Sequence, residues 1–123
     1  MWSYEAPLRD MQFVLEHWLQ APAAWQRHPA FAALDLPLAV QVLEEAARFS
    51  QGVLAPLNNQ GDRQGCRWQA GRVSTPDGFV EAYRAYVEGG WPALACAEEQ
   101  GGQGLDCQWP GLAHHVPDRV SGW

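Results

Sequence analysis

The chain of 123 residues carries 14 acidic and 8 basic side chains, which give a formal charge of −6. That length suits one domain over residues 1–123, and a hydrophobic fraction of 47% excludes a disordered acidic tail. All eight basic residues are arginines spread along the chain, whereas phosphate binding needs clustered positive charge, so we expect no nucleic-acid partner. We also expect no membrane association, because no apolar run approaches the roughly 20 residues that span a bilayer.

Cysteine and histidine spacing bears on compartment and metal binding. Three cysteines, Cys66, Cys96 and Cys107, are an odd number, and the N-terminus lacks the pattern of a secretory signal. These features predict reduced thiols and a cytoplasmic protein. The cysteine spacings match no zinc pattern, and adjacent His114 and His115 would point about 100° apart on a helix. We therefore predict no metal site.

The first helical pattern follows an irregular lead-in. Its apolar residues recur at i, i+3, i+4, i+7 and i+8, which indicates one buried helix face: Met11, Val14, Leu15, Trp18 and Leu19. Pro22 is expected to stop this helix because proline disrupts a helix interior. Residues 21–29, with proline near both ends, are interpreted as a connector.

A second, longer helix is predicted to start with Asp35 as its cap and Pro37 in its first turn. Its stripe at helical period comprises Ala39, Val42, Leu43, Ala46, Phe49, Val53 and Leu54. Glu44 and Arg48 are expected to form an i, i+4 ion pair on the wet side. Pro56 and the pair Asn58–Asn59 are predicted to close the helix.

A hairpin and a third helix follow. Residues 66–68 and 72–74 flank Gln69-Ala70-Gly71, which predicts a short β-hairpin with glycine in its turn. Thr75, Pro76 and Asp77 predict a capped helix start. The expected inward stripe is Phe79, Ala82, Tyr83, Tyr86 and Val87, and Gly89–Gly90 should end the helix.

The last third of the chain is less patterned. Residues 91–97 favour one short helical turn, and residues 98–104 form a glycine-rich loop. A fourth helix over residues 112–122 is doubtful because Pro117 lies within it. The predicted fold is all-α: a small bundle of three to four helices with one short β-hairpin.

Local motifs alone point to no catalytic residue. The glycine loop lacks the P-loop and dinucleotide-binding patterns, so its spacing favours a flexible turn over a ligand loop. The pairs Glu44–Glu45 and Glu98–Glu99 are interpreted as surface charge, because catalytic carboxylates must face each other across a site. Seven tryptophans suggest core packing, or else a surface that meets another domain or subunit.

Taken together, several runs resemble the opening of bacterial FAD-dependent acyl-CoA dehydrogenases, in a group that includes the 3-methylmercaptopropionyl-CoA dehydrogenases. The runs keep the order and spacing of that family over residues 4–105. They are YEAPLRDMQFVL (4–15), LEEA (43–46), VLAPLN (53–58), GDRQGC (61–66), TPDGF (75–79), AYRAYVEGGW (82–91) and GGQGL (101–105). The first run and the Ala-Tyr-Arg run are specific, whereas the glycine loop alone is weak.

The resemblance implies the N-terminal helical domain of this family, inactive alone, which in a whole enzyme would wall one side of the flavin and acyl-chain site. The FAD and the catalytic base belong to later domains of the family, so we expect no cofactor and no catalytic residue in this chain. Gly101, Gly102 and Gly104 would shape the edge of an acyl pocket. Residues 106–123 diverge, which suggests a truncated or frameshifted copy, or a fragment.

Two other functions remain open at this point. The chain is either a stand-alone protein-interaction module, or a subunit completed in trans by a separate flavin-binding chain. A domain made to pack on others leaves apolar surface bare, so we expect self-association or docking to acyl-CoA dehydrogenase domains.

Overall fold

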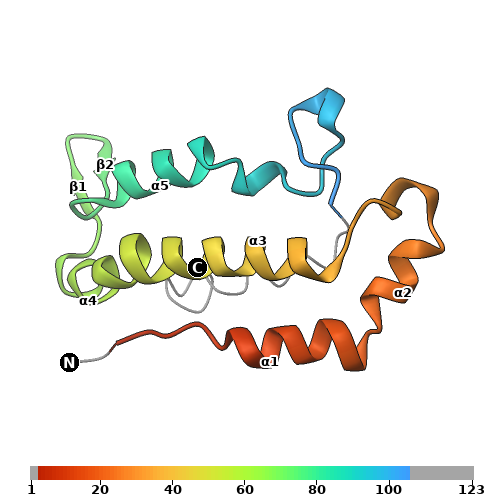
Figure 1. The fold of residues 1–123 in the computed structure, drawn as a ribbon. Helices are drawn as coiled ribbons and strands as arrows, with labels where there is room; N and C mark the ends of the chain where they lie inside the picture. Colours follow the sequence, from red (N-terminus) through yellow and green to blue (C-terminus); the bar gives the residue numbers. More distant parts are fainter. Residues whose placement is uncertain (1–2, 106–123) are drawn as a thin grey trace.

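The computed structural model describes residues 3–105 (Figure 1), in which four helical segments and one hairpin form a small, mostly helical unit. The predicted fold class is therefore confirmed. The elements are α1 (Leu8–Phe13), α2 (Ala21–Gln26), α3 (Leu36–Phe49), α4 (Ala55–Gln64), β1 (Arg67–Gln69), β2 (Arg72–Ser74) and α5 (Phe79–Glu88). Figure 1 shows α3 between α1 and α5. The doubtful fourth helix over residues 112–122 lies outside the described residues.

The first helix changes its winding near its end. α1 passes into a π turn over Val14–Trp18, where the amide of Leu19 donates to the carbonyl oxygen of Val14 over 2.8 Å. Met11 and Leu15 are buried as predicted, but Trp18 is 77% exposed. A π turn holds more residues than an α turn, so it rotates Trp18 away from the stripe that a regular helix would produce.

The prediction of a connector over residues 21–29 was wrong, because α2 occupies most of it. Gln20 adopts a left-handed conformation, with φ of 47°, which redirects the chain before α2 begins. Pro22 lies in the first turn of α2, where its missing N–H costs little. Trp25 is 1% exposed and fills the core, so this short helix contributes one of the largest buried side chains.

The second predicted helix begins as expected and ends later. Asp35 caps α3, since its Oδ1 accepts a hydrogen bond from the amide of Leu38 at 2.8 Å. The helix does not close at Pro56. A π turn over Ser50–Leu54 leads directly into α4, and Pro56 occupies the first turn of α4. The π turn restarts the hydrogen-bond pattern, so the proline no longer interrupts it.

Two further details of this region differ from expectation. Asn58 and Asn59 lie within α4 rather than beyond its end. Arg48 pairs with Glu45 over 2.5 Å, and not with Glu44. Both i, i+3 and i, i+4 neighbours share a helix face, so spacing alone does not choose between the two glutamates.

The predicted hairpin is confirmed. β1 and β2 pair antiparallel with Trp68 opposite Val73. Ala70 and Gly71 form the two-residue turn, and both have positive φ, at 51° and 77°. Two consecutive positive φ values are typical of the turn whose twist matches a tight hairpin.

α5 starts later than the sequence predicts. Its first residue is Phe79, and Gly78 with φ of 87° precedes it without a side-chain cap. Thr75 therefore does not cap the helix. The amide of Asp77 instead donates to the Gln64 side chain over 3.1 Å, which ties this connection to the end of α4.

The predicted inward stripe of α5 is only partly correct. Ala82 is buried, but Tyr83 is 69% exposed and Val87 is 46% exposed. α5 is an outer layer with one covered side, on which Tyr86 contacts Phe49 of α3, with ring centroids 6.3 Å apart. The helix ends at Gly89, as predicted, and Gly90 follows with φ of 76°.

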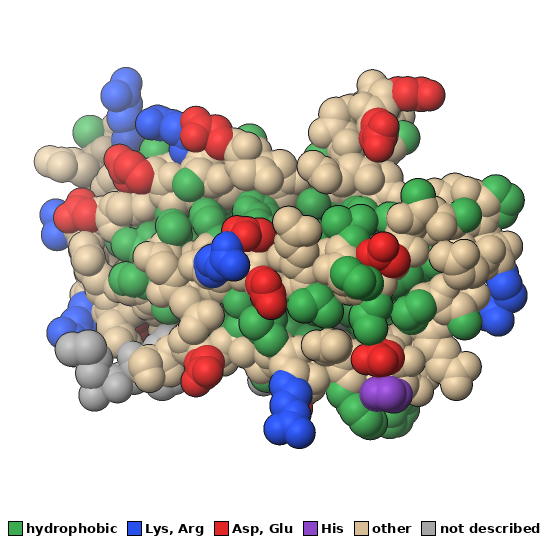
Figure 2. All heavy atoms as spheres, in the orientation of Figure 1, with side chains coloured by type: hydrophobic (Ala, Val, Ile, Leu, Met, Phe, Trp, Pro, Cys, Tyr) green, Lys and Arg blue, Asp and Glu red, His purple; other side chains and the backbone are tan. Residues whose placement is uncertain are grey.

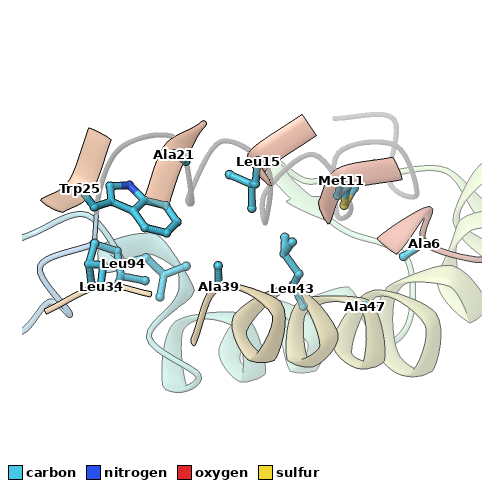
Figure 3. Packing of buried hydrophobic residues seen from close by; sticks show 12 residues of the cluster. Ala6, Met11, Leu15, Ala21, Trp25, Leu34, Ala39, Leu43, Ala47 and Leu94 are labelled. Carbon is cyan, nitrogen blue, oxygen red and sulfur yellow. The ribbon is translucent and has the colours of Figure 1, made fainter. Parts of the chain in front are cut away.

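The buried core lies between α3 and the α1–α2 arm, as Figure 3 shows. Met11 and Leu15 face Leu43, while Trp25 lies beside Leu34 and Leu94. The cluster comprises Ala6, Met11, Leu15, Ala21, Trp25, Leu34, Ala39, Leu43, Ala46, Ala47, Leu94 and Leu105, with no member from α5. Over residues 3–105 no helix combines the length and apolar character needed to cross a membrane.

Candidate functional site

The glycine loop at residues 94–105 is a closed, hydrogen-bonded structure. The amide of Leu105 donates to the carbonyl oxygen of Leu94 over 3.1 Å, and the amide of Gly104 donates to that of Cys96 over 2.8 Å. A 3-10 turn over Glu98–Gln100 forms the outer end. Because both ends of the loop meet, it holds its shape through its own backbone, as compact surface loops commonly do. This corrects the expectation of a flexible turn.

The three glycines predicted at the site meet different backbone requirements. Gly101 and Gly104 have φ of 82° and 62°, a region that favours glycine. Gly102 lies against the carbonyl oxygens of Ala93 and Cys96, so a side chain would not fit there. Gly101 is exposed and the other two are half-buried. The loop brings all three together, and their place at the edge of an acyl pocket stays a prediction.

The loop does not fit a phosphate or pyrophosphate group. Such sites present a row of free backbone N–H groups. Here the amides of Gly101 and Gly102 donate to the carbonyl oxygens of Glu98 and Ala97, over 2.9 and 3.1 Å. Those of Gly104 and Leu105 are bonded within the loop as well. The flavin of the family implied by the sequence thus finds no cradle in this loop, although glycine is abundant.

Apolar side chains attach the loop to the rest of the molecule. Leu94 and Leu105 are 6% and 5% exposed and belong to the core. Trp91, in a 3-10 turn over Trp91–Ala93, packs against Phe49 of α3, with ring centroids 6.2 Å apart. The anchoring role of Leu94 and Leu105 was not predicted, although their apolar character on either side of a polar loop was a usable signal.

The titratable residues considered in the sequence have local structural roles where the structure describes them. His17 packs on the ring of Phe13, at 5.2 Å between centroids. His28 accepts a hydrogen bond from the amide of Ala30 at 3.3 Å. Cys66 and Cys96 are free and exposed. Within residues 3–105 no three His, Cys, Asp or Glu side chains converge as metal ligands would. His114, His115 and Cys107 lie outside the described residues.

A shallow depression of about 490 Å³ runs along α4 and was not predicted. Its lining recurs at helical spacing, so it follows one face of α4: Pro56, Asn59, Gln60, Arg63 and Gln64. The lining contains one charged group, Arg63, and neither a nucleophile nor a carboxylate. This depression therefore offers polar contacts but no catalytic chemistry.

Comparison with known proteins bears on the origin of this domain. The chain matches no established protein-family model. It is 39% identical over 103 residues to a 3-methylmercaptopropionyl-CoA dehydrogenase of Ruegeria pomeroyi. The match covers 84% of this chain but 17% of that relative, so the chain spans about a sixth of the relative's length. The resemblance to this group of acyl-CoA dehydrogenases is therefore confirmed over most of the chain.

Proposed function

We propose that this chain corresponds to the N-terminal helical domain of an acyl-CoA dehydrogenase and that it has no dehydrogenase activity alone. In a whole enzyme it would form one wall of the site that holds the flavin and the acyl chain. The observation that carries the proposal is the 39% identity over 103 residues, which extends across the helices, the hairpin and the glycine loop.

The division of labour follows from the reaction. Removal of hydrogens across a carbon–carbon bond needs a base for the proton and an acceptor for the hydride, and FAD is the acceptor in this family. The loop amides of this chain are engaged with loop carbonyl groups, so they do not serve as a flavin pyrophosphate site. In this proposal other domains hold the flavin and the base, and this chain supplies shape.

The closed loop suits such a wall. Its backbone is held by the bonds from Leu105 to Leu94 and from Gly104 to Cys96. Nothing lies within 4 Å of the position that a Cβ atom on Gly101 would occupy, so the surface at this glycine is open. A glycine edge lets an acyl chain approach the backbone closely. A rigid edge of this kind excludes water and orients the chain without taking part in bond breaking.

A chimeric enzyme tests the proposal. The residues of the Ruegeria dehydrogenase that match this chain are replaced with residues from this chain, and flavin absorbance is followed without oxygen while 3-methylmercaptopropionyl-CoA is added. We expect bound flavin and substrate-dependent bleaching. A chimera that binds flavin and the thioester but never bleaches would contradict the role of this chain as a wall of that site.

The isolated chain provides the second arm. Mixed with FAD and a range of acyl-CoA thioesters, it should leave the flavin absorbance unchanged. Bleaching that depends on the isolated chain would overturn the proposal. Activity that appears only after a separate flavin-binding chain is added would support completion in trans.

A further inference from the structure

The outer face of α5 carries a stripe of exposed apolar side chains that the described residues leave uncovered. Val80, Tyr83 and Val87 are 55%, 69% and 46% exposed, respectively. Their spacing at i, i+3 and i+7 places them on one side of the helix, opposite buried Ala82. Arg84 is exposed beside them and forms no ion pair with another described residue.

The order of these four residues is self-complementary. When two copies of α5 lie antiparallel about a twofold axis between positions 83 and 84, Val80 of one copy faces Val87 of the other. The same register places Tyr83 opposite Arg84, and this pairing occurs twice. A guanidinium over a tyrosine ring is attracted by the ring's negative face. A twofold interface requires this reciprocity, in which one patch meets itself.

The charges at the two ends of α5 favour the same orientation. Arg63, Arg67 and Arg72 are exposed at the end of α4 and on the hairpin, beside the start of α5 (Figure 1). Asp62 and Asp77 lie nearby, so that end keeps a small positive charge. Residues 85–105, beyond the middle of α5, contain three glutamates and no basic residue.

The glutamates at the far end are exposed: Glu88, Glu98 and Glu99. Figure 2 shows basic side chains over the hairpin end of the upper surface and acidic ones over the glycine loop. An antiparallel pair brings the basic end of one copy toward the acidic end of the other. A parallel pair would place like charges together, which opposes association.

We propose that this face binds a second copy of the same chain, with the two α5 helices antiparallel and Tyr83 of each copy against Arg84 of the other. The apolar stripe covers two helical turns, so the dimer is weak and forms at high concentration. The inference goes beyond the proposed function, because it does not depend on flavin or on an acyl-CoA.

Sedimentation equilibrium over a wide range of protein concentration tests the proposal. The unmodified chain should form a reversible dimer. Tyr83→Lys places a cation opposite Arg84, and Arg84→Glu places an anion opposite the ring of Tyr83. Each single change should weaken dimerisation about tenfold or more through lost attraction or like-charge repulsion. The double variant Y83K/R84E puts Lys opposite Glu twice and should restore the dimer.

The double variant separates this register from others, because in a parallel pair Lys would face Lys and Glu would face Glu. The control is Trp18→Glu, which changes a 77% exposed aromatic residue in the π turn that follows α1. It should leave dimerisation unchanged, and circular dichroism confirms that each variant is folded. A monomer at every concentration, a loss caused by Trp18→Glu, or no rescue in the double variant would each overturn the proposal.

Discussion

A Cβ atom on Gly102 would lie 2.1 Å from the carbonyl oxygen of Cys96 and 2.5 Å from that of Ala93. Both oxygens belong to the backbone, and Cys96 also accepts the hydrogen bond from Gly104. They cannot move aside without breaking the closed loop. We therefore expect Gly102→Ala to lower the free energy of unfolding by about 1–3 kcal/mol, the usual cost of forced overpacking. Urea denaturation measures the change.

Gly52→Ala is the matched control for that variant. Gly52 lies in the π turn over Ser50–Leu54, and nothing lies within 4 Å of the position that its Cβ would occupy. Alanine costs less conformational entropy than glycine in a helix, so we expect a gain of about 0.5–1 kcal/mol. Equal stability of Gly102→Ala and the unmodified chain would contradict the close approach in the loop.

Tyr83 is the second test, because its place in a helical stripe and its place in the structure disagree. The stripe alone predicts a core residue, whose replacement by alanine would cost on the order of 3 kcal/mol. With 69% of the residue exposed, we expect Tyr83→Ala to cost less than about 0.5 kcal/mol in dilute solution. Leu43→Ala, at a position 3% exposed, should cost about 2–5 kcal/mol. Equivalent denaturation midpoints for the two variants would mean that the side of α5 facing the core is wrong.

The two predicted helix caps give a third comparison. Asp35 accepts the hydrogen bond from the amide of Leu38, so Asp35→Ala should cost about 1 kcal/mol. Thr75 is exposed and lies before the Gly78 turn, not at the start of α5. Thr75→Ala should therefore change the unfolding free energy by less than about 0.5 kcal/mol. Thermal unfolding of both variants under one condition checks this, and a larger loss for Thr75→Ala would return the cap to that residue.

The hairpin turn offers a stabilising change. Ala70 has φ of 51°, a left-handed conformation that costs an L-residue other than asparagine or glycine about 1 kcal/mol or more. Asparagine followed by glycine is the preferred pair for this turn. We expect Ala70→Asn to slow hydrogen exchange at the β1 and β2 amides. Gly71→Ala, at φ of 77°, should have the opposite effect, and faster exchange in Ala70→Asn would contradict the turn conformation.

The helices that could be predicted are those with signals close together in the sequence. Asp35 and the stripe from Ala39 to Ala46 define α3, because a cap and an apolar period of 3.6 both act within a few residues. The hairpin was predictable for the same reason, since Ala70–Gly71 favours a tight turn between two short strands. The resemblance to acyl-CoA dehydrogenases also came from short runs in a fixed order.

The wrong predictions all involve a choice that local chemistry leaves open. Pro22 and Pro56 were expected to stop helices, yet both lie in the first turn of a new one. Proline suits either place, and the preceding backbone decides between them: a left-handed Gln20 in one case and a π turn before Ala55 in the other. Trp18 left the predicted stripe because another π turn changed the winding.

Caps, turns and apolar periods are local properties, so the amino-acid order alone specifies a small helical unit with a hairpin and a glycine loop. Packing between elements sets which faces are covered and why Gly102 must be glycine. α5 has a covered side set by Phe49 and an outer side left with Tyr83, and its apolar pattern runs onto both. Burial depends on which elements pack together, and the contacts of Gly102 with Ala93 and Cys96 exist only after the loop has closed.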